Sequence, residues 1–415
     1  MMDEVRRVLI TGAGVISPLG DTPAKLHEAL CEGRSGFKPV EVFATNGLGP
    51  QTAGEVRPFE PKSYLGERNL RPVDRTAQLL LAAAQRALED SGWTPELRKQ
   101  REVGLVLGTN FCSVRTIAEF DRRGLQLGPS YVSPFDFANS VINAAAGQTA
   151  IWHDLRGVNS TLSAGEASGL MAIASAADLI RTGRADALLA GGVEELCFES
   201  FLGFHRGGKL TGGDPVPFDA RRDGFALAEG AALLMLEDAE SAAARGARVL
   251  GEILGSGSTF DAASDGASDG MAVARAIRLA LEDAGTAPEE IGCLSASANG
   301  SVEADRQEAR GIAAALGTRA ADIPVTAVKS MLGEAVGASG AFQAVALLGT
   351  LNDGRLPGIR GLESTEEGFP LSGVSAQIRN LGETRLGLRL GLINAIGSGG
   401  HVCAVVLGRI GGGAA

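Results

Sequence analysis

The 415-residue sequence lacks the features that mark membrane, secreted, metal-binding and nucleic-acid-binding proteins. No apolar run reaches the roughly 18 residues of a membrane span, and no signal-peptide pattern precedes the first predicted strand. The five cysteines form no CxxC pair, which favours reduced, buried thiols and a cytoplasmic location. The four histidines show no metal-ligand spacing, so we expect no metal. The net charge of −11 argues against nucleic acid as the main partner.

Aromatic residues are scarce at 5%, whereas glycine is abundant with 58 residues. This composition suits a tightly packed α/β protein in which helices lie close to strands. The length allows a large core and two domains or two fused halves. Periodicity predicts strands at 5–10, 103–107, 187–190, 231–237, 249–255, 294–297, 386–393 and 402–407, and helices at 76–91, 169–182, 237–245, 271–285 and 339–352.

The segment Thr11-Gly12-Ala13-Gly14 follows the first predicted strand and is interpreted as a glycine turn. A dinucleotide-binding fingerprint would need a third glycine where this chain has Ser17. The sequence therefore gives little support for a nucleotide site, and we expect no cofactor.

A faint internal repeat divides the chain into two halves. A small-residue segment at 163–166 leads into a predicted helix that ends in Gly183-Arg184. A second such segment at 337–340 leads into a helix that ends in Gly354-Arg355. Repetition of this kind can arise by chance, but it favours duplicated halves at 1–248 and 249–412.

Glu166 occupies the position where the chain would be expected to present a nucleophile. It lies among small residues at the start of a predicted helix, where the helix dipole favours an anion. A Cys or Ser there would indicate acyl transfer, but a carboxylate is a poor nucleophile for that reaction. Three interpretations stay open: a helix-capping carboxylate, an anchor in a partner interface, and a catalytic acid or base.

A series of motifs runs in order along about 400 residues. The motifs are residues 8–20, the segments Ser133-Pro134-Phe135, 143–147 and 155–157, then Pro217-Phe218-Asp219 with 222–225 and 229–231, and the C-terminal glycine loop Gly397-Ser398-Gly399-Gly400. Together they make the chain resemble the β-ketoacyl synthases of the thiolase superfamily. The resemblance implies an α/β fold with five layers, α-β-α-β-α, made of two similar halves, and it places the glycine loop near the active site.

The resemblance also shows what has been lost. The family's chemistry uses a Cys nucleophile and two His residues, and this sequence has Glu166, Asn299 and Glu334 at those positions. Two further positions match retained family residues, Lys329 and the supporting acid Glu308. This pattern resembles the chain-length factor (KSβ), a non-catalytic subunit that carries Gln at the nucleophile position in most relatives. The resemblance implies a heterodimer with an active ketosynthase (KSα), and the acyl carrier protein would bind mainly through that partner.

The same resemblance places Glu166 and Glu334 close together, with Lys329 as the natural cation between them. We therefore predict a buried Glu166–Lys329–Glu334 cluster that fills a former active site. A raised pKa would alternatively let Glu166 act as a base, which would make the protein a decarboxylase or hydrolase of carrier-bound acyl chains. A third possibility is a self-associating scaffold without an enzyme partner.

Phe111, Val114, Ile117 and Phe120 have the spacing of one helical face. They are interpreted either as core residues or, from the family resemblance, as gate residues that end the tunnel for the growing chain. As a gate they would set product length by their volume. The nearby Cys112 is interpreted as a buried structural thiol.

Overall fold

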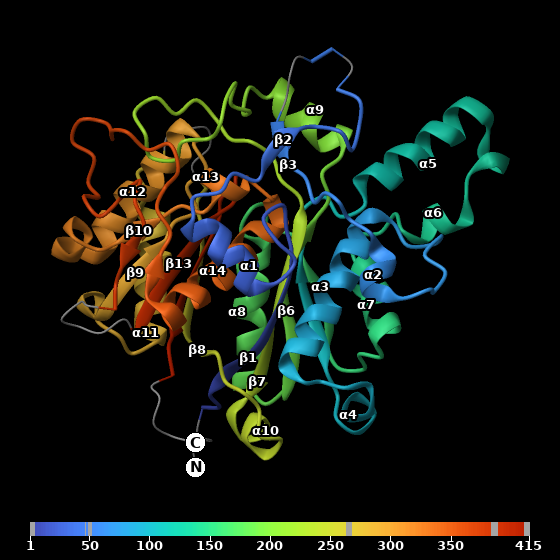
Figure 1. Ribbon diagram of the computed structural model, residues 1–415, viewed down its shortest axis with the longest axis horizontal. Helices are drawn as coiled ribbons and strands as arrows, with labels where there is room; N and C mark the ends of the chain where they lie inside the picture. Colours follow the sequence, from blue (N-terminus) through green and yellow to red (C-terminus); the bar gives the residue numbers. More distant parts are fainter. Residues whose placement is uncertain (1–4, 46, 49–51, 263–267, 383–388, 411–415) are drawn as a thin grey trace.

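The computed structural model describes residues 5–45, 47–48, 52–262, 268–382 and 389–410 (Figure 1). Its main feature is a ten-stranded sheet with the strand order β10-β9-β13-β14-β8-β1-β7-β6-β4-β5. The sheet strands are β1 (Val8–Ile16), β4 (Gly104–Gly108), β5 (Asn159–Leu162), β6 (Ala187–Glu194), β7 (Gly230–Asp238), β8 (Gly251–Phe260), β9 (Ile291–Ser295), β10 (Val325–Thr326), β13 (Leu390–Ile396) and β14 (His401–Gly408). Two small sheets pair β2 (Phe37–Pro39) with β3 (Thr52–Gly54), and β11 (Arg355–Leu356) with β12 (Arg379–Asn380).

The large sheet consists of two similar halves that meet at β1 and β8. Counting outward from this seam, β1, β7, β6, β4 and β5 correspond to β8, β14, β13, β9 and β10. The pairing directions agree at every step: two antiparallel pairs are followed by two parallel pairs in each half. The strand order therefore confirms the predicted duplication. The boundary placed at residue 248 stays a prediction.

Helices cover both faces of each half. One core cluster joins α8 (Ser168–Arg181) and α14 (Ser339–Asp353) to the inner faces of both half sheets. A second cluster packs α3 (Arg75–Ser91) and α7 (Ala144–His153) on the outer face of the first half. A third packs α11 (Met271–Asp283) and α12 (Val302–Leu316) on the second half. These layers confirm the thiolase-like α-β-α-β-α fold.

Among the described residues, no helix combines the length and apolar character needed to cross a membrane.

The shorter elements connect these layers. The remaining helices are α1 (Pro23–Cys31), α2 (Pro61–Leu65), α4 (Pro95–Gln100), α5 (Val114–Leu127), α6 (Pro134–Ala138), α9 (Phe198–Arg206), α10 (Ala239–Ala244) and α13 (Lys329–Leu332), with 3₁₀ turns η1 (Pro129–Tyr131), η2 (Pro288–Glu290), η3 (Gly317–Ala321) and η4 (Val336–Ala338).

The predicted glycine turn at 11–14 is wrong, because these residues belong to the buried strand β1. The reason is close packing between strand and helix. A Cβ atom on Gly14 would lie 2.0 Å from the carbonyl oxygen of Ala83 in α3. A Cβ on Gly12 would lie 2.6 Å from the Cβ of Ser91 in the same helix. Glycine at both positions lets α3 approach the strand backbone.

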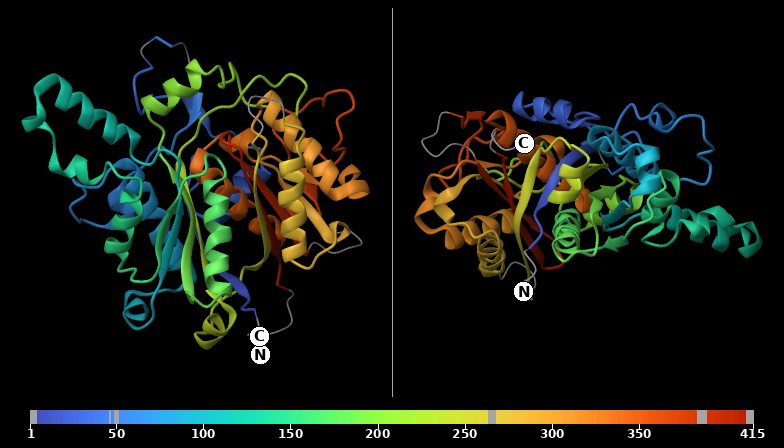
Figure 2. Two further views of the ribbon diagram at one scale, coloured as in Figure 1. Left: turned by 180° about the vertical axis from the view of Figure 1, so that it is seen from behind. Right: turned by 90° about the horizontal axis from the view of Figure 1, so that it is seen from below.

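The helices α5 and α6, with the segment that leads to α7, form an arm that projects from the body of the molecule (Figures 1 and 2). We call residues 114–142 the arm. Neither α5 nor α6 contains a buried residue. Apolar side chains are nevertheless exposed from the end of α5 onward: Leu125, Leu127, Tyr131, Phe135, Phe137, Val141 and Ile142.

The expectation that Phe111 shares a helical face with Val114, Ile117 and Phe120 is wrong. Cys112 has a φ of 48°, which no α-helix accommodates, and α5 begins only at Val114. Phe111 therefore lies in the loop before the helix. Val114, Ile117 and Phe120 lie on the arm.

Candidate functional site

Glu166 lies in the turn directly before the central helix α8, and 6% of the residue is exposed. Its carboxylate accepts a 2.7 Å hydrogen bond from the backbone N–H of Ser398 in the glycine loop. Burial and the neighbouring Glu334 raise the pKa of Glu166. Hydrogen bonds from the N–H of Ser398 and its own N–H, together with Lys329, oppose this rise. Two backbone N–H groups thus face the carboxylate.

Glu334 forms the centre of a saturated polar cluster in which it is fully buried. Its carboxylate accepts from Lys329 Nζ at 2.7 Å and from Asn299 Nδ2 at 2.8 Å. The hydroxyl of Ser339 at 2.5 Å and the N–H of Val336 at 3.0 Å complete the set. Lys329 is itself 2% exposed, so this is a buried ion pair. All four donors fix the carboxylate in place.

Only part of the predicted cluster of Glu166, Lys329 and Glu334 is therefore joined by direct hydrogen bonds. Lys329 and Glu334 touch, and Asn299 joins them. Glu166 interacts electrostatically with both ions, but takes its hydrogen bond from Ser398 instead. The three positions where the family resemblance expects Cys, His and His meet in one buried site.

Glu308 lies in α12 and is 1% exposed. It accepts a 2.6 Å hydrogen bond from the N–H of Ser297 and a second one from Asn394 Nδ2. Burial raises its pKa to about 8. A carboxyl group with that pKa is mostly protonated at neutral pH, so Glu308 is a neutral neighbour of the ion pair.

Asp305 is a further buried acid that was not identified as a site residue from the sequence. It accepts from the N–H groups of Phe218 at 2.9 Å, Asn299 at 3.0 Å and Gly300 at 3.2 Å. Burial raises its pKa to about 6. These bonds hold the loop that carries Asn299. Its place in the first turn of α12, three residues before Glu308, was the available signal.

A cavity of about 910 Å³ opens onto this site. Phe111 and Glu166 share it, although they are far apart in sequence. The lining that bears on the function comprises Phe111, Glu166, Phe204, Asn299, Glu308 and the glycine loop Gly397-Ser398-Gly399-Gly400. Of the four predicted gate residues, Phe111 lies at this cavity, in edge-to-face contact with Phe204 at 5.9 Å between ring centroids.

Among the described residues, no cysteine or histidine lines this cavity. Burial raises the pKa of the Cys112 thiol to about 11, so that thiol is not a nucleophile at neutral pH. Paired backbone N–H groups can stabilise an oxyanion, but here the N–H of Ser398 in the glycine loop and that of Glu166 itself already interact with the carboxylate of Glu166.

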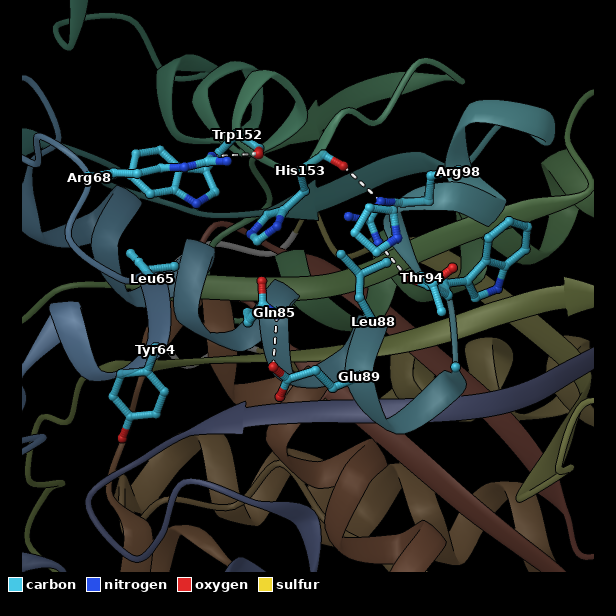
Figure 3. A pocket seen from close by; sticks show the side chains of 13 residues that line it. Tyr64, Leu65, Arg68, Gln85, Leu88, Glu89, Thr94, Arg98, Trp152 and His153 are labelled. Carbon is cyan, nitrogen blue, oxygen red and sulfur yellow. Dashed lines mark hydrogen bonds between the residues drawn. The ribbon is translucent and has the colours of Figure 1, made fainter.

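A second hollow of about 460 Å³ lies between α3, α4 and α7 (Figure 3). It contains none of the predicted site residues. Arg98 donates to the carbonyl oxygens of His153 and Trp93, and Arg68 lies over the ring of Trp152 at 4.9 Å. These arginines are engaged in contacts within the protein.

The duplicated layers, with a site at the head of α8, define a protein of the thiolase-like acyl-transfer class. Models of the β-ketoacyl synthase N-terminal and C-terminal domains match residues 5–242 and 250–363, and the chain belongs to the β-ketoacyl synthase family. The family carries out condensation in fatty acid or type II polyketide synthesis, which confirms the broader prediction from the sequence.

Relatives of two kinds resemble the whole chain. It is 34% identical to a 3-oxoacyl-[acyl-carrier-protein] synthase 2 of Synechocystis sp., over 96% of this chain and 97% of that protein. It is 35% identical to the tetracenomycin polyketide synthase ketoacyl synthase beta subunit of Streptomyces glaucescens, over 97% and 98%. The solved structure of the ishigamide ketosynthase/chain length factor superposes with a TM-score of 0.92 at 34% identity, covering 98% and 100%.

Proposed function

We propose that this protein is a non-catalytic chain-length factor that pairs with an active ketosynthase. Glu166 carries the proposal, because a carboxylate replaces the nucleophile and faces the N–H pair that would bind an oxyanion. Asn299 lines the cavity, but its side-chain amide donates to the buried Glu334. In the complex, the partner would supply Cys and two His for decarboxylative Claisen condensation.

The arm is the proposed surface for the active ketosynthase. Leu125 is 87% exposed, and Phe135 and Phe137 are 65% and 66% exposed. Several large apolar side chains exposed on one projecting segment favour an interaction site there. The strand β5, which ends the sheet, is only partly buried and offers an edge to the same partner.

The roles of the two subunits would differ. The net charge of −11 fits a division in which the partner presents the main binding surface for the acyl carrier protein. Phe111, which lies at the cavity, is the proposed gate residue with the most direct access to a growing chain. Val114, Ile117 and Phe120 would act from the arm.

Gel filtration with an active ketosynthase, best the product of a neighbouring gene, tests the pairing. We expect wild type and Glu166→Ala each to form a heterodimer with the partner, and both heterodimers to make product. Removal of the partner's nucleophile should abolish product formation.

Leu125→Asp on the arm should abolish the heterodimer. The matched variant Leu279→Asp changes a leucine in α11 that is 40% exposed, and should leave the heterodimer intact. Condensation by this chain alone would contradict the proposal, and self-association without the partner would favour a scaffold.

Glu166 lines the cavity and has a raised pKa, and these two observations support a second candidate function. In that case Glu166 would act as a base in a decarboxylase or hydrolase of carrier-bound acyl chains. The isolated protein would then release CO₂ from malonyl-carrier protein, and Glu166→Ala would abolish the release. CO₂ release that persists in Glu166→Ala would exclude this role for the carboxylate.

A further inference from the structure

Glu194 is a buried acid at the end of β6 that lies outside the cluster around Glu334. It is 1% exposed and belongs to the first half of the chain. Burial raises its pKa to about 7, and hydrogen bonds from backbone N–H groups oppose that rise. The donors to its carboxylate are Thr109 Oγ1 at 3.2 Å and the N–H groups of Asn110 at 2.8 Å, Phe111 at 3.0 Å, Cys112 at 3.0 Å and Gly337 at 3.1 Å.

These donors belong to two different loops. The first, residues 109–112, connects β4 to the arm and carries Phe111 to the cavity. The second, residues 334–338, begins at Glu334 in the buried ion pair. The loops also touch directly, since a Cβ on Gly337 would lie 2.6 Å from the Cα of Thr109. One carboxylate therefore holds the loop of the arm against the loop of the former active site.

Both loops contain a strained residue next to an N–H group that Glu194 binds. Cys112 has a φ of 48°, and Val336, which is β-branched, has a φ of 41°. Such conformations persist only where the surrounding structure holds them. The N–H groups of Asn110, Phe111 and Cys112 are successive along the chain and converge on one carboxylate, which is the arrangement called an anion-binding nest. The hydrogen bonds that Glu194 accepts from both loops hold these two strained residues in place.

The same bonds connect the arm to the site. Val336 donates to Glu334, and Gly337 donates to Glu194. On the other side, the hydroxyl of Thr76 donates to the carbonyl oxygen of Cys112 at 2.9 Å, two residues before α5 begins. Because α5 has no buried residue, this loop contributes to fixing where the arm leaves the body, together with the bond from Thr116 in α5 to Asp74.

We propose that Glu194 is a positioning residue that couples the arm to the cavity. It holds Phe111 and the start of the arm against the loop after Glu334, so that a change at one loop reaches the other. The identification of the partner on the arm rests on the proposed function. The coupling itself lies within this chain and does not depend on that partner.

Hydrogen–deuterium exchange of the isolated chain tests the coupling. Glu194→Ala should speed exchange about tenfold at the amides of 110–112 and of Gly337 together. Glu194→Gln, which keeps one acceptor oxygen, should give a smaller increase in both loops. The matched control is Glu195→Gln, which changes an adjacent buried acid whose Oε1 has no hydrogen-bond partner among the described residues, and should leave both loops unchanged.

Several outcomes would overturn the coupling. Faster exchange in only one loop would refute it, and so would an equal increase in the core of α3, which would show general unfolding instead. If Glu194→Ala fails to fold, Thr109→Val removes one donor and should still loosen both loops by a smaller factor.

A second experiment adds an active ketosynthase. Partner binding should slow exchange at Gly337 in wild type and not in Glu194→Gln; equal slowing in both would also refute the coupling. If no partner binds, the proposed function fails while the measurement on the isolated chain still stands.

Discussion

Replacing Lys329 with Met removes the cation from the buried cluster and leaves its shape nearly unchanged. Lys329 is 2% exposed and Glu334 is fully buried, with 2.7 Å between Nζ and the carboxylate. Breaking a buried ion pair by removing one partner costs about 3–5 kcal/mol, because the remaining charge is uncompensated. Glu166 adds to the cost, since Lys329 lowers its pKa against the effect of Glu334. We expect Lys329→Met to lower the free energy of unfolding by that amount.

Urea denaturation at neutral pH, followed by circular dichroism, measures the loss. The double variant Lys329→Met/Glu334→Gln removes both charges and should recover most of the lost stability. Lys209→Met provides a matched control, because Lys209 lines the cavity next to this cluster but is exposed, and should cost less than about 0.5 kcal/mol. A loss below about 1 kcal/mol for Lys329→Met would refute the ion pair as a stabilising contact.

Three further predictions concern single residues. Gly14→Ala should lower the free energy of unfolding by about 3 kcal/mol in a urea titration, because the new Cβ would lie 2.0 Å from the carbonyl oxygen of Ala83. Burial raises the pKa of Glu308 to about 8, so its proton stabilises the native state at acidic pH, and this contribution is lost as the pH rises toward 8. Wild-type stability should therefore fall by about 3 kcal/mol more than that of Glu308→Gln between about pH 5 and 8, and parallel pH profiles would contradict this. Phe111→Ala should lengthen the product of the reconstituted complex, and an unchanged chain length would exclude Phe111 as the gate.

Periodicity was sufficient for several of the long elements of the fold, although it missed α12 (Val302–Leu316). The helix predicted at 76–91 is α3 (Arg75–Ser91), and the helix predicted at 339–352 is α14 (Ser339–Asp353). Both present repeating apolar residues to a sheet, and that signal is visible in one dimension. The strand at 11–14 was missed because glycine indicates a turn by itself. Only the neighbouring helix α3 explains why glycine is needed inside this strand.

In the candidate site too, some contacts could be predicted from the sequence and others could not. The contact of Lys329 with Glu334 followed from the family resemblance, since opposite charges five residues apart at one site are expected to pair. The hydrogen bond from Ser398 to Glu166, and the nest around Glu194, use backbone N–H groups. Every residue except proline has such a group, so no side-chain pattern identifies the ones that converge. Phe111 was misplaced for a similar reason, because the φ of Cys112 cannot be inferred from its residue type.

The position of β1 in the sheet has a consequence for the synthesis of this protein in the cell. All nine residues of β1 are buried, yet its first partner strand, β7, starts only at Gly230. At roughly 5–20 residues per second, on the order of 10–40 s pass before that partner leaves the ribosome. Throughout this time an apolar strand stays unpaired and able to aggregate. We therefore expect the yield of folded protein, more than its final stability, to depend on chaperones and on the rate of translation.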